Sequence, residues 1–318
     1  MTRTPATRLL SGSTVSRCVT TLTRTRLRIL GYHGVPSAAA FQRHLAHLVE
    51  RFRPVSGAQV QAAALGKAPL PSRAVWVTFD DGDPTVVTVA LPLLARYGVP
   101  ATMFLCPGVV DTATPYWWQV LQAAQRLDLP LDELGLPAEH TEGALKQLPD
   151  GERRRVIDHL TSAIEERTGA APTQQQLTSE QLTTWTAAGH EVGNHSWDHP
   201  LLDRCTDDQQ REQIRTAHDW LSERVGSAPT TFAYPNGNWS ATSEHELRRL
   251  GYRVAVGFDH RLTRTDVDPL RLSRLRVDAD AALPRYRSIL SGAHSGLLAG
   301  YRRLRDDTWA TDPRRLPT

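Results

Sequence analysis

Cysteine, lysine and long apolar runs are scarce in this 318-residue chain. Its three cysteines, Cys18, Cys106 and Cys205, are widely separated and form no CxxC pair, which argues against a disulfide framework or a cysteine-based zinc site. No apolar run approaches the roughly 20 residues that a membrane-spanning helix requires. The net charge of +3 is too small to indicate nucleic-acid binding. With 40% hydrophobic and 22% charged residues, the composition is typical of a soluble globular protein.

The N-terminal segment has a composition of its own. No acidic residue precedes Glu50, and six arginines lie within the first 28 residues. Such a segment can be a basic tail without fixed structure, a transit-like leader rich in Ser, Thr and Arg, or a surface for anionic lipid. Nothing before Arg24 forms the sustained apolar stretch of a secretory signal peptide. We therefore expect a cytoplasmic protein, with peripheral association to an anionic membrane as the open alternative.

Seven short segments rich in β-branched and apolar residues are expected to form strands: Leu27–His33, Val75–Phe79, Ala101–Leu105, His190–Asn194, Thr231–Tyr234, Arg253–Gly257 and Leu270–Val277. Segments with helical periodicity lie between them, one of which begins with a capping box at Thr178 and Gln181. This alternation predicts a parallel sheet, either closed or open. Polar residues follow several strand ends, as active-site residues do in barrels, and we therefore expect a barrel: His33, Asp80, Asp81, His195 and Tyr234.

Residues 111–173 interrupt the alternation. The segment carries Tyr116, Trp117 and Trp118 near its start, and a helix is expected over Glu152–Thr168. We interpret it as an insertion after the third strand, because its apolar content is low for a core of its own. The expected organisation is a basic tail or helix over residues 1–26, a barrel over 27–290 and a C-terminal tail over 291–318.

Two motifs carry residues suited to metal chemistry. The sequence TFDDG places Asp80 and Asp81 where a strand becomes a turn, although either could simply cap the next element. The sequence HSWDH places His195 and His199 at i and i+4, a spacing that zinc proteins use. Two imidazoles and one carboxylate leave a divalent ion with open positions, which is the catalytic rather than the structural arrangement.

A third motif, FAYPNG, ends a strand in a Pro/Gly turn. It could be an ordinary turn. The functional interpretation is that the backbone N–H of Tyr234 points into the barrel mouth as an oxyanion donor, with Pro235 beside the substrate.

Taken in this order, TFDDG, HSWDH and FAYPNG resemble the motifs of the polysaccharide deacetylase family, also called NodB-homology deacetylases, over about residues 27–277. The resemblance implies a distorted (β/α)7 barrel that hydrolyses N-acetyl groups on glycans. It also implies Asp80 as catalytic base, and Asp81, His195 and His199 as ligands of one divalent metal ion. Zinc is the default for this donor set, although such sites accept other first-row ions.

The chain departs from the best-known members of this family at two places. Ala233 stands where those members carry an arginine that holds the catalytic aspartate, and their late Leu-x-x-His motif is missing. The chain instead resembles a subgroup that combines a Tyr-His first strand with FAYP. Leu30-Gly-Tyr-His33 is itself a Leu-x-x-His, and a closed barrel tolerates such a circular shift. We therefore expect His33 to be the general acid and Arg274 to replace the arginine, with Arg271 and Arg276 as competitors.

Tryptophans near these motifs are candidates for sugar binding, because aromatic faces suit the C–H faces of sugar rings. Trp197 lies between the two histidines, Trp239 follows the FAYPNG turn, and Trp117 belongs to the insertion. Each could instead pack its own loop. The expected partner is an N-acylated glycan or a lipid-linked sugar. Two alternatives stay open: a deformylase or amidase acting on a small or lipid-linked substrate, and a glycan-binding protein that has lost catalysis.

Overall fold

The computed structural model describes residues 13–131, 135, 140–264 and 267–295. All seven predicted strands are present and pair in parallel. They are β1 (Arg28–Tyr32), β3 (Ala74–Phe79), β4 (Ala101–Leu105), β5 (Glu191–Asn194), β6 (Thr231–Ala233), β7 (Val254–Gly257) and a last segment divided into β8 (Leu272–Ser273) and β9 (Leu275–Arg276). A short extra strand, β2 (Arg53–Pro54), pairs with β3.

The last segment closes the sheet. Its first half pairs with β7, where Ser273 lies opposite Gly257, and its second half pairs with β1, where Leu275 lies opposite Leu30. Arg274 alone separates the two halves, and its N–H donates to the Gly257 carbonyl at 3.1 Å. One continuous segment therefore connects the two ends of the sheet, and the predicted (β/α)7 barrel is confirmed.

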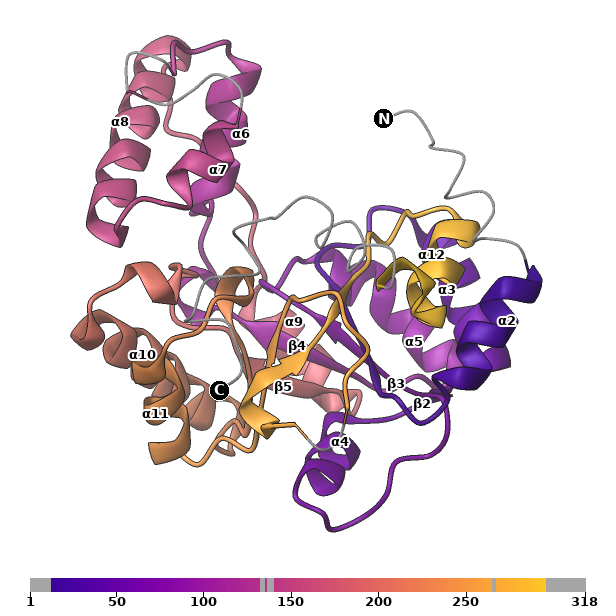
Figure 1. The fold of residues 1–318 in the computed structure, drawn as a ribbon. Helices are drawn as coiled ribbons and strands as arrows, with labels where there is room; N and C mark the ends of the chain where they lie inside the picture. The colour runs from indigo at the N-terminus through magenta and orange to yellow at the C-terminus, as the bar shows by residue number, and fades with distance from the viewer. Residues whose placement is uncertain (1–12, 132–134, 136–139, 265–266, 296–318) are drawn as a thin grey trace.

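Helices surround the strands (Figure 1). Strand residues alternate between an inner cluster, which includes Ile29 and Trp76, and an outer one, which includes Leu30 and Val77 and packs against the helices. The predicted capping box at Thr178 is present. The helices are α3 (Ala38–Arg51), α4 (Gly57–Ala64), α5 (Leu91–Tyr97), which follows a π-helical turn (Val86–Ala90), α9 (Ser179–Ala187), α10 (Asp207–Val225), α11 (Ala241–Arg249) and α12 (Leu283–Ser291).

The insertion is helical and stands apart from the barrel in Figure 1. Its helices are α6 (Trp117–Arg126), α7 (Thr141–Leu145) and α8 (Asp150–Thr168). Helix α8 is the one predicted from the sequence, and it begins two residues before the expected start at Glu152. The expectation that this segment is too poor in apolar residues for a core was wrong. Apolar faces of all three helices meet in one cluster: Val120, Leu121, Ala124, Leu145, Leu160 and Ile164.

Helix α2 (Ser13–Leu22) precedes β1. At the start of β1, the buried Arg28 guanidinium donates to the carbonyl of Leu290 in α12 at 2.7 Å, which fixes α12 against the strand. The rest of the predicted basic tail (residues 1–12) and most of the predicted C-terminal tail (296–318) lie outside the described residues. Among the residues described, no helix is both long and apolar enough to cross a membrane.

Candidate active site

The carboxyl ends of three strands bring the predicted polar residues to one mouth of the barrel. His33 follows β1, Asp80 and Asp81 follow β3, and His195 follows β5. They border a cavity of about 540 Å³. The barrel contributes Asp83, Pro84, Asn236, Phe258, His260 and Arg276 to its lining, and the insertion contributes Tyr116, Trp117, Trp118 and a series of glutamines. A second cavity of about 570 Å³ lies far from these groups, near the amino ends of β5 and β6.

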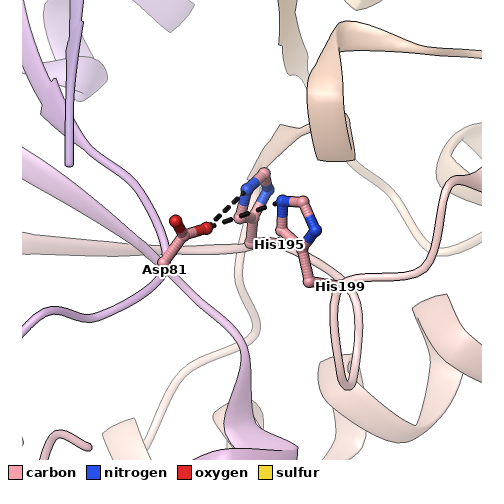
Figure 2. A group of neighbouring side chains, drawn as sticks. All are labelled: Asp81, His195 and His199. Atoms are coloured by element: carbon pink, nitrogen blue, oxygen red, sulfur yellow. Dashed lines mark ion pairs between the residues drawn. The ribbon is translucent and has the colours of Figure 1, made fainter. Parts of the chain in front are cut away.

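Asp81, His195 and His199 form a compact group of potential metal ligands (Figure 2). Their ligand atoms all lie within 4.8 Å of one another, and all three residues are buried. Asp81 Oδ1 is 3.4 Å from His195 Nε2 and 3.6 Å from His199 Nε2. This buried oxygen accepts no hydrogen bond from the residues that the structure describes. A buried carboxylate oxygen without a donor is costly, so a cation bound beside it would be stabilising.

The protonation of the two histidines suits a metal ion. His195 Nδ1 lies 2.6 Å from the Ala233 carbonyl, which can only accept, so the proton is on Nδ1 and Nε2 is free to coordinate. Burial lowers the pKa of His199 to about 4, so its imidazole is neutral near pH 7. Burial also lowers the pKa of His195, but Asp80 and Asp81 outweigh it and raise that pKa overall. The two carboxylates therefore stabilise positive charge at Nε2, where a proton and a metal ion would compete. The residues present therefore fit a divalent cation.

Asp80 is held by Arg274 in the interior of the barrel. The two guanidinium nitrogens lie 2.6 Å and 2.7 Å from the two carboxylate oxygens, and both side chains are fully buried. Burial acts to raise the pKa of Asp80, but Arg274 and nearby His195 more than offset it and lower that pKa. Arg271 instead pairs with Glu244, and Arg276 lines the cavity. Of the three arginines considered from the sequence, Arg274 is thus the one that contacts Asp80.

His33 lies on the solvent side of the same group. Its side chain is 38% exposed, and its Nε2 is 3.9 Å from Asp81 Oδ2. The imidazole stacks on the ring of Phe258 with a centroid distance of 6.0 Å. His33 is therefore close to the ligand group yet open to the cavity.

The prediction for Tyr234 was wrong. Its N–H donates to the Val256 carbonyl at 3.0 Å and so belongs to the sheet, and its hydroxyl donates to the Leu270 carbonyl. The residue lies one position past β6 and still takes part in the pairing with β7. Its N–H is therefore unavailable to a substrate oxygen.

Three of the four predicted substrate-binding residues do not line the cavity. Pro235 is buried in the turn after β6. Trp239 packs beside the cluster around Phe232 and lies under the Arg271 guanidinium, 4.0 Å from the ring centroid. Trp197 packs against Gly108, where any Cβ would come within 2.7 Å of its indole nitrogen. Both tryptophans therefore pack against neighbouring segments, whereas Trp117 does line the cavity.

The motifs gave no signal for several other lining residues. Phe258 follows β7, and Asn236 lies in the turn after β6 with left-handed backbone (φ 55°). Gln119, Gln122 and the run Gln174–Gln176 come from the insertion and its return to the barrel. A run of glutamines is polar and without pattern, so the sequence alone does not distinguish a cavity wall from a solvated loop.

Comparison with known proteins identifies a family. Residues 67–255, more than half of the chain, match the profile of the polysaccharide deacetylase family. Poly-beta-1,6-N-acetyl-D-glucosamine N-deacetylase of Escherichia coli K12 is 25% identical over 237 residues, which are 70% of this chain and 32% of that protein. The chain thus spans about a third of that relative. Peptidoglycan-N-acetylmuramic acid deacetylase PdaC of Bacillus subtilis is 30% identical over 93 residues, 28% of this chain and 20% of PdaC.

Solved structures share the fold. The Streptococcus pyogenes deacetylase PplD, in complex with acetate, superposes with a TM-score of 0.58 at 19% identity, covering 83% of this chain and 97% of that one. IcaB from Ammonifex degensii gives 0.58 at 20% identity, covering 85% and 97%. The profile match and the shared fold together establish that this chain belongs to the polysaccharide deacetylase family.

Proposed function

We propose that the chain is a metal-dependent hydrolase that removes N-acetyl groups from an amino-sugar glycan. The observation that carries this proposal is the division of labour between two adjacent carboxylates. Asp81 faces two histidines, and Asp80 is directed to a buried arginine instead. One carboxylate can therefore bind a metal ion while its neighbour handles a proton. Membership of the family and the N-deacetylase names of the relatives support the same reaction.

Asp81, His195 and His199 would hold the metal ion. Such an ion supplies Lewis acidity for activating water and polarising the amide carbonyl. Asp80 accepts the proton of the attacking water. Its oxygen Oδ2 lies 3.8 Å from His195 Nε2, so the base sits next to the ligand group. Arg274 keeps the Asp80 carboxylate ionised and fixes its orientation through two parallel hydrogen bonds.

Because the Tyr234 N–H belongs to the sheet, we assign the backbone donor to the oxyanion to the turn that follows β6 instead. Pro235 has no N–H, so the next backbone donor after Tyr234 belongs to Asn236. This residue lines the cavity, and its left-handed backbone turns the chain sharply at this point. We propose that the Asn236 N–H stabilises the negative charge that develops on the carbonyl oxygen.

His33 protonates the leaving amine, which is otherwise a poor leaving group. His33→Ala is therefore expected to lose about 10²–10⁴-fold in kcat and to retain its metal content, since His33 is outside the ligand group. Acetate release and metal content measured on the same preparation check this. His260→Ala is the matched control, because His260 lines the same cavity. Full activity in His33→Ala with loss in His260→Ala would transfer the role to His260.

The insertion provides the wall that selects the glycan. Trp117 and Trp118 offer aromatic faces to a sugar ring, and the glutamine amides can bond its hydroxyls and acetamido groups. Trp117→Ala is expected to raise KM for an N-acetylglucosamine oligomer about tenfold but to leave KM for a minimal acetamide nearly unchanged. Trp239→Ala serves as the control, because Trp239 does not line the cavity. Equal losses on both substrates in Trp117→Ala would show a structural role.

The substrate and the acyl group are tested together. Acetate and formate release would be measured on a panel of N-acylated sugars: free, oligomeric and lipid-linked. Release of acetate from the oligomers supports the proposal. Release of formate, or activity on lipid-linked sugars alone, would favour the deformylase or lipid-linked alternative. Binding of oligomers without hydrolysis would favour a glycan-binding protein.

A further inference from the structure

The three potential metal ligands are held in different ways. The barrel itself fixes His195, whose N–H donates to the Leu105 carbonyl of β4 and whose Nδ1 bonds the Ala233 carbonyl of β6. Asp81 and His199 lie beyond regular structure, and both have left-handed backbone, with φ of 69° and 62°. Non-glycine residues adopt this region at a cost, so surrounding contacts must hold them there.

The start of α6 in the insertion supplies contacts to both residues. The buried Tyr116 hydroxyl donates to the Asp81 carbonyl at 2.7 Å. The Tyr116 ring stacks on Trp118 with centroids 4.4 Å apart and planes 6° apart. Trp118 in turn meets the His199 imidazole edge-on, with a centroid distance of 4.6 Å. One stacked pair therefore contacts both left-handed ligands.

This aromatic pair has a fixed place because the base of the insertion is tied together. The N–H of Gln174, on the returning segment, donates to the Ala113 carbonyl at 2.9 Å. The buried Gln176 donates its side-chain amide to the Thr114 carbonyl at 2.7 Å. The outgoing and returning segments of the insertion are thus bonded to each other directly before Tyr116.

We propose that Tyr116 and Trp118 are positioning residues for the metal centre, so that the insertion sets the metal affinity as well as lining the cavity. The proposal rests on the metal site of the proposed function. Tyr116 fixes the Asp81 backbone, and Trp118 limits the rotation of the His199 ring. The backbone N–H and the Nδ1 of His195 bond strands of the barrel, whereas the insertion contacts the other two ligands directly.

The test is the Zn²⁺ affinity of the full chain, measured by competition with a chromophoric chelator. Tyr116→Phe removes the hydroxyl and keeps the stacked ring, and Trp118→Leu removes the contact with His199. Each variant is expected to lose about 10–100-fold in Zn²⁺ affinity, the range seen when partners of metal ligands are changed. The control is Trp117→Phe, which changes the neighbouring aromatic residue and should bind Zn²⁺ as the wild type does. Circular dichroism of each metal-free variant checks that the fold is kept.

The outcomes separate this inference from the proposed function. Wild-type affinity in both Tyr116→Phe and Trp118→Leu would overturn the positioning role and leave the deacetylase proposal intact. A wild-type chain that binds no divalent ion would overturn both. An equal loss in Trp117→Phe would assign the effect to the packing of the whole turn and would also overturn the role of the stacked pair. Weakened binding in the first two variants alone supports it.

Discussion

Asp80→Asn is expected to fold, to keep its metal ion and to lose about 10²–10⁴-fold in kcat. An amide has nearly the shape of the carboxylate but cannot accept the proton of the attacking water. Its oxygen can still accept a hydrogen bond from one nitrogen of Arg274, but its N–H₂ group faces the other nitrogen, so the variant keeps the fold while losing one of the two bonds and some stability. Asp81 and both histidines are unchanged, and metal binding should therefore persist.

The measurement is acetate release together with metal content on the same sample. Asp83→Asn is the matched control, because Asp83 lines the same cavity and accepts a hydrogen bond from the Thr85 N–H rather than from Arg274. It should retain most of its turnover. If Asp80→Asn turned over as fast as Asp83→Asn, Asp80 would not be the base.

Among the variants proposed for this protein, Arg274→Met should lower the free energy of unfolding most. The substitution leaves the Asp80 carboxylate buried without its partner, which costs about 3–5 kcal/mol in comparable cases. Turnover should fall as well, because the base loses its orientation. Arg271→Met is the matched control: Arg271 pairs with Glu244 at the edge of the barrel and is 28% exposed, so the loss there should be much smaller.

The stability deficit of Arg274→Met, meaning its loss in free energy of unfolding, should depend on pH, and this dependence gives a further check. In the wild type the folded-state pKa of Asp80 is lowered, so its ionisation stabilises the fold above the ordinary aspartate pKa and that contribution disappears as the pH falls. Without Arg274, burial is no longer offset by the guanidinium, and the pKa of Asp80 should rise. The deficit of Arg274→Met in urea denaturation should therefore be largest near neutral pH and shrink in acid. A deficit independent of pH would mean that lost packing, not the ion pair, is responsible.

The sequence predicted the barrel and which polar residues meet at its mouth, and the reason is physical. Parallel strands in a barrel end at one mouth, so polar residues just beyond β1, β3 and β5 must meet there whatever lies between them in sequence. The contact between Arg274 and Asp80 was one of three possibilities that the sequence left open. It depends on the register of the closing segment, where Leu275 pairs with Leu30, and a short strand does not specify such a register.

The predictions that were wrong concern the side chains of loops and the exact end of a strand. Tyr234 was expected to point its N–H into the mouth, but the ladder with β7 continues one residue past β6. Trp239 lies near the motifs in sequence, yet it packs beside an apolar cluster under Arg271. Proximity in sequence does not fix the direction of a loop side chain. The core of the insertion was missed because its apolar residues are spread over three helices.

The central claim is that the site at the barrel mouth hydrolyses the N-acetyl amide of an amino sugar with a bound divalent ion. The most direct test is to incubate the metal-loaded chain with an N-acetylglucosamine oligomer and to quantify acetate and free primary amine together. We expect both to appear in equal amounts, a chelator to stop their release, and added Zn²⁺ to restore it. Acetate without amine, or release that a chelator does not affect, would contradict metal-dependent N-deacetylation.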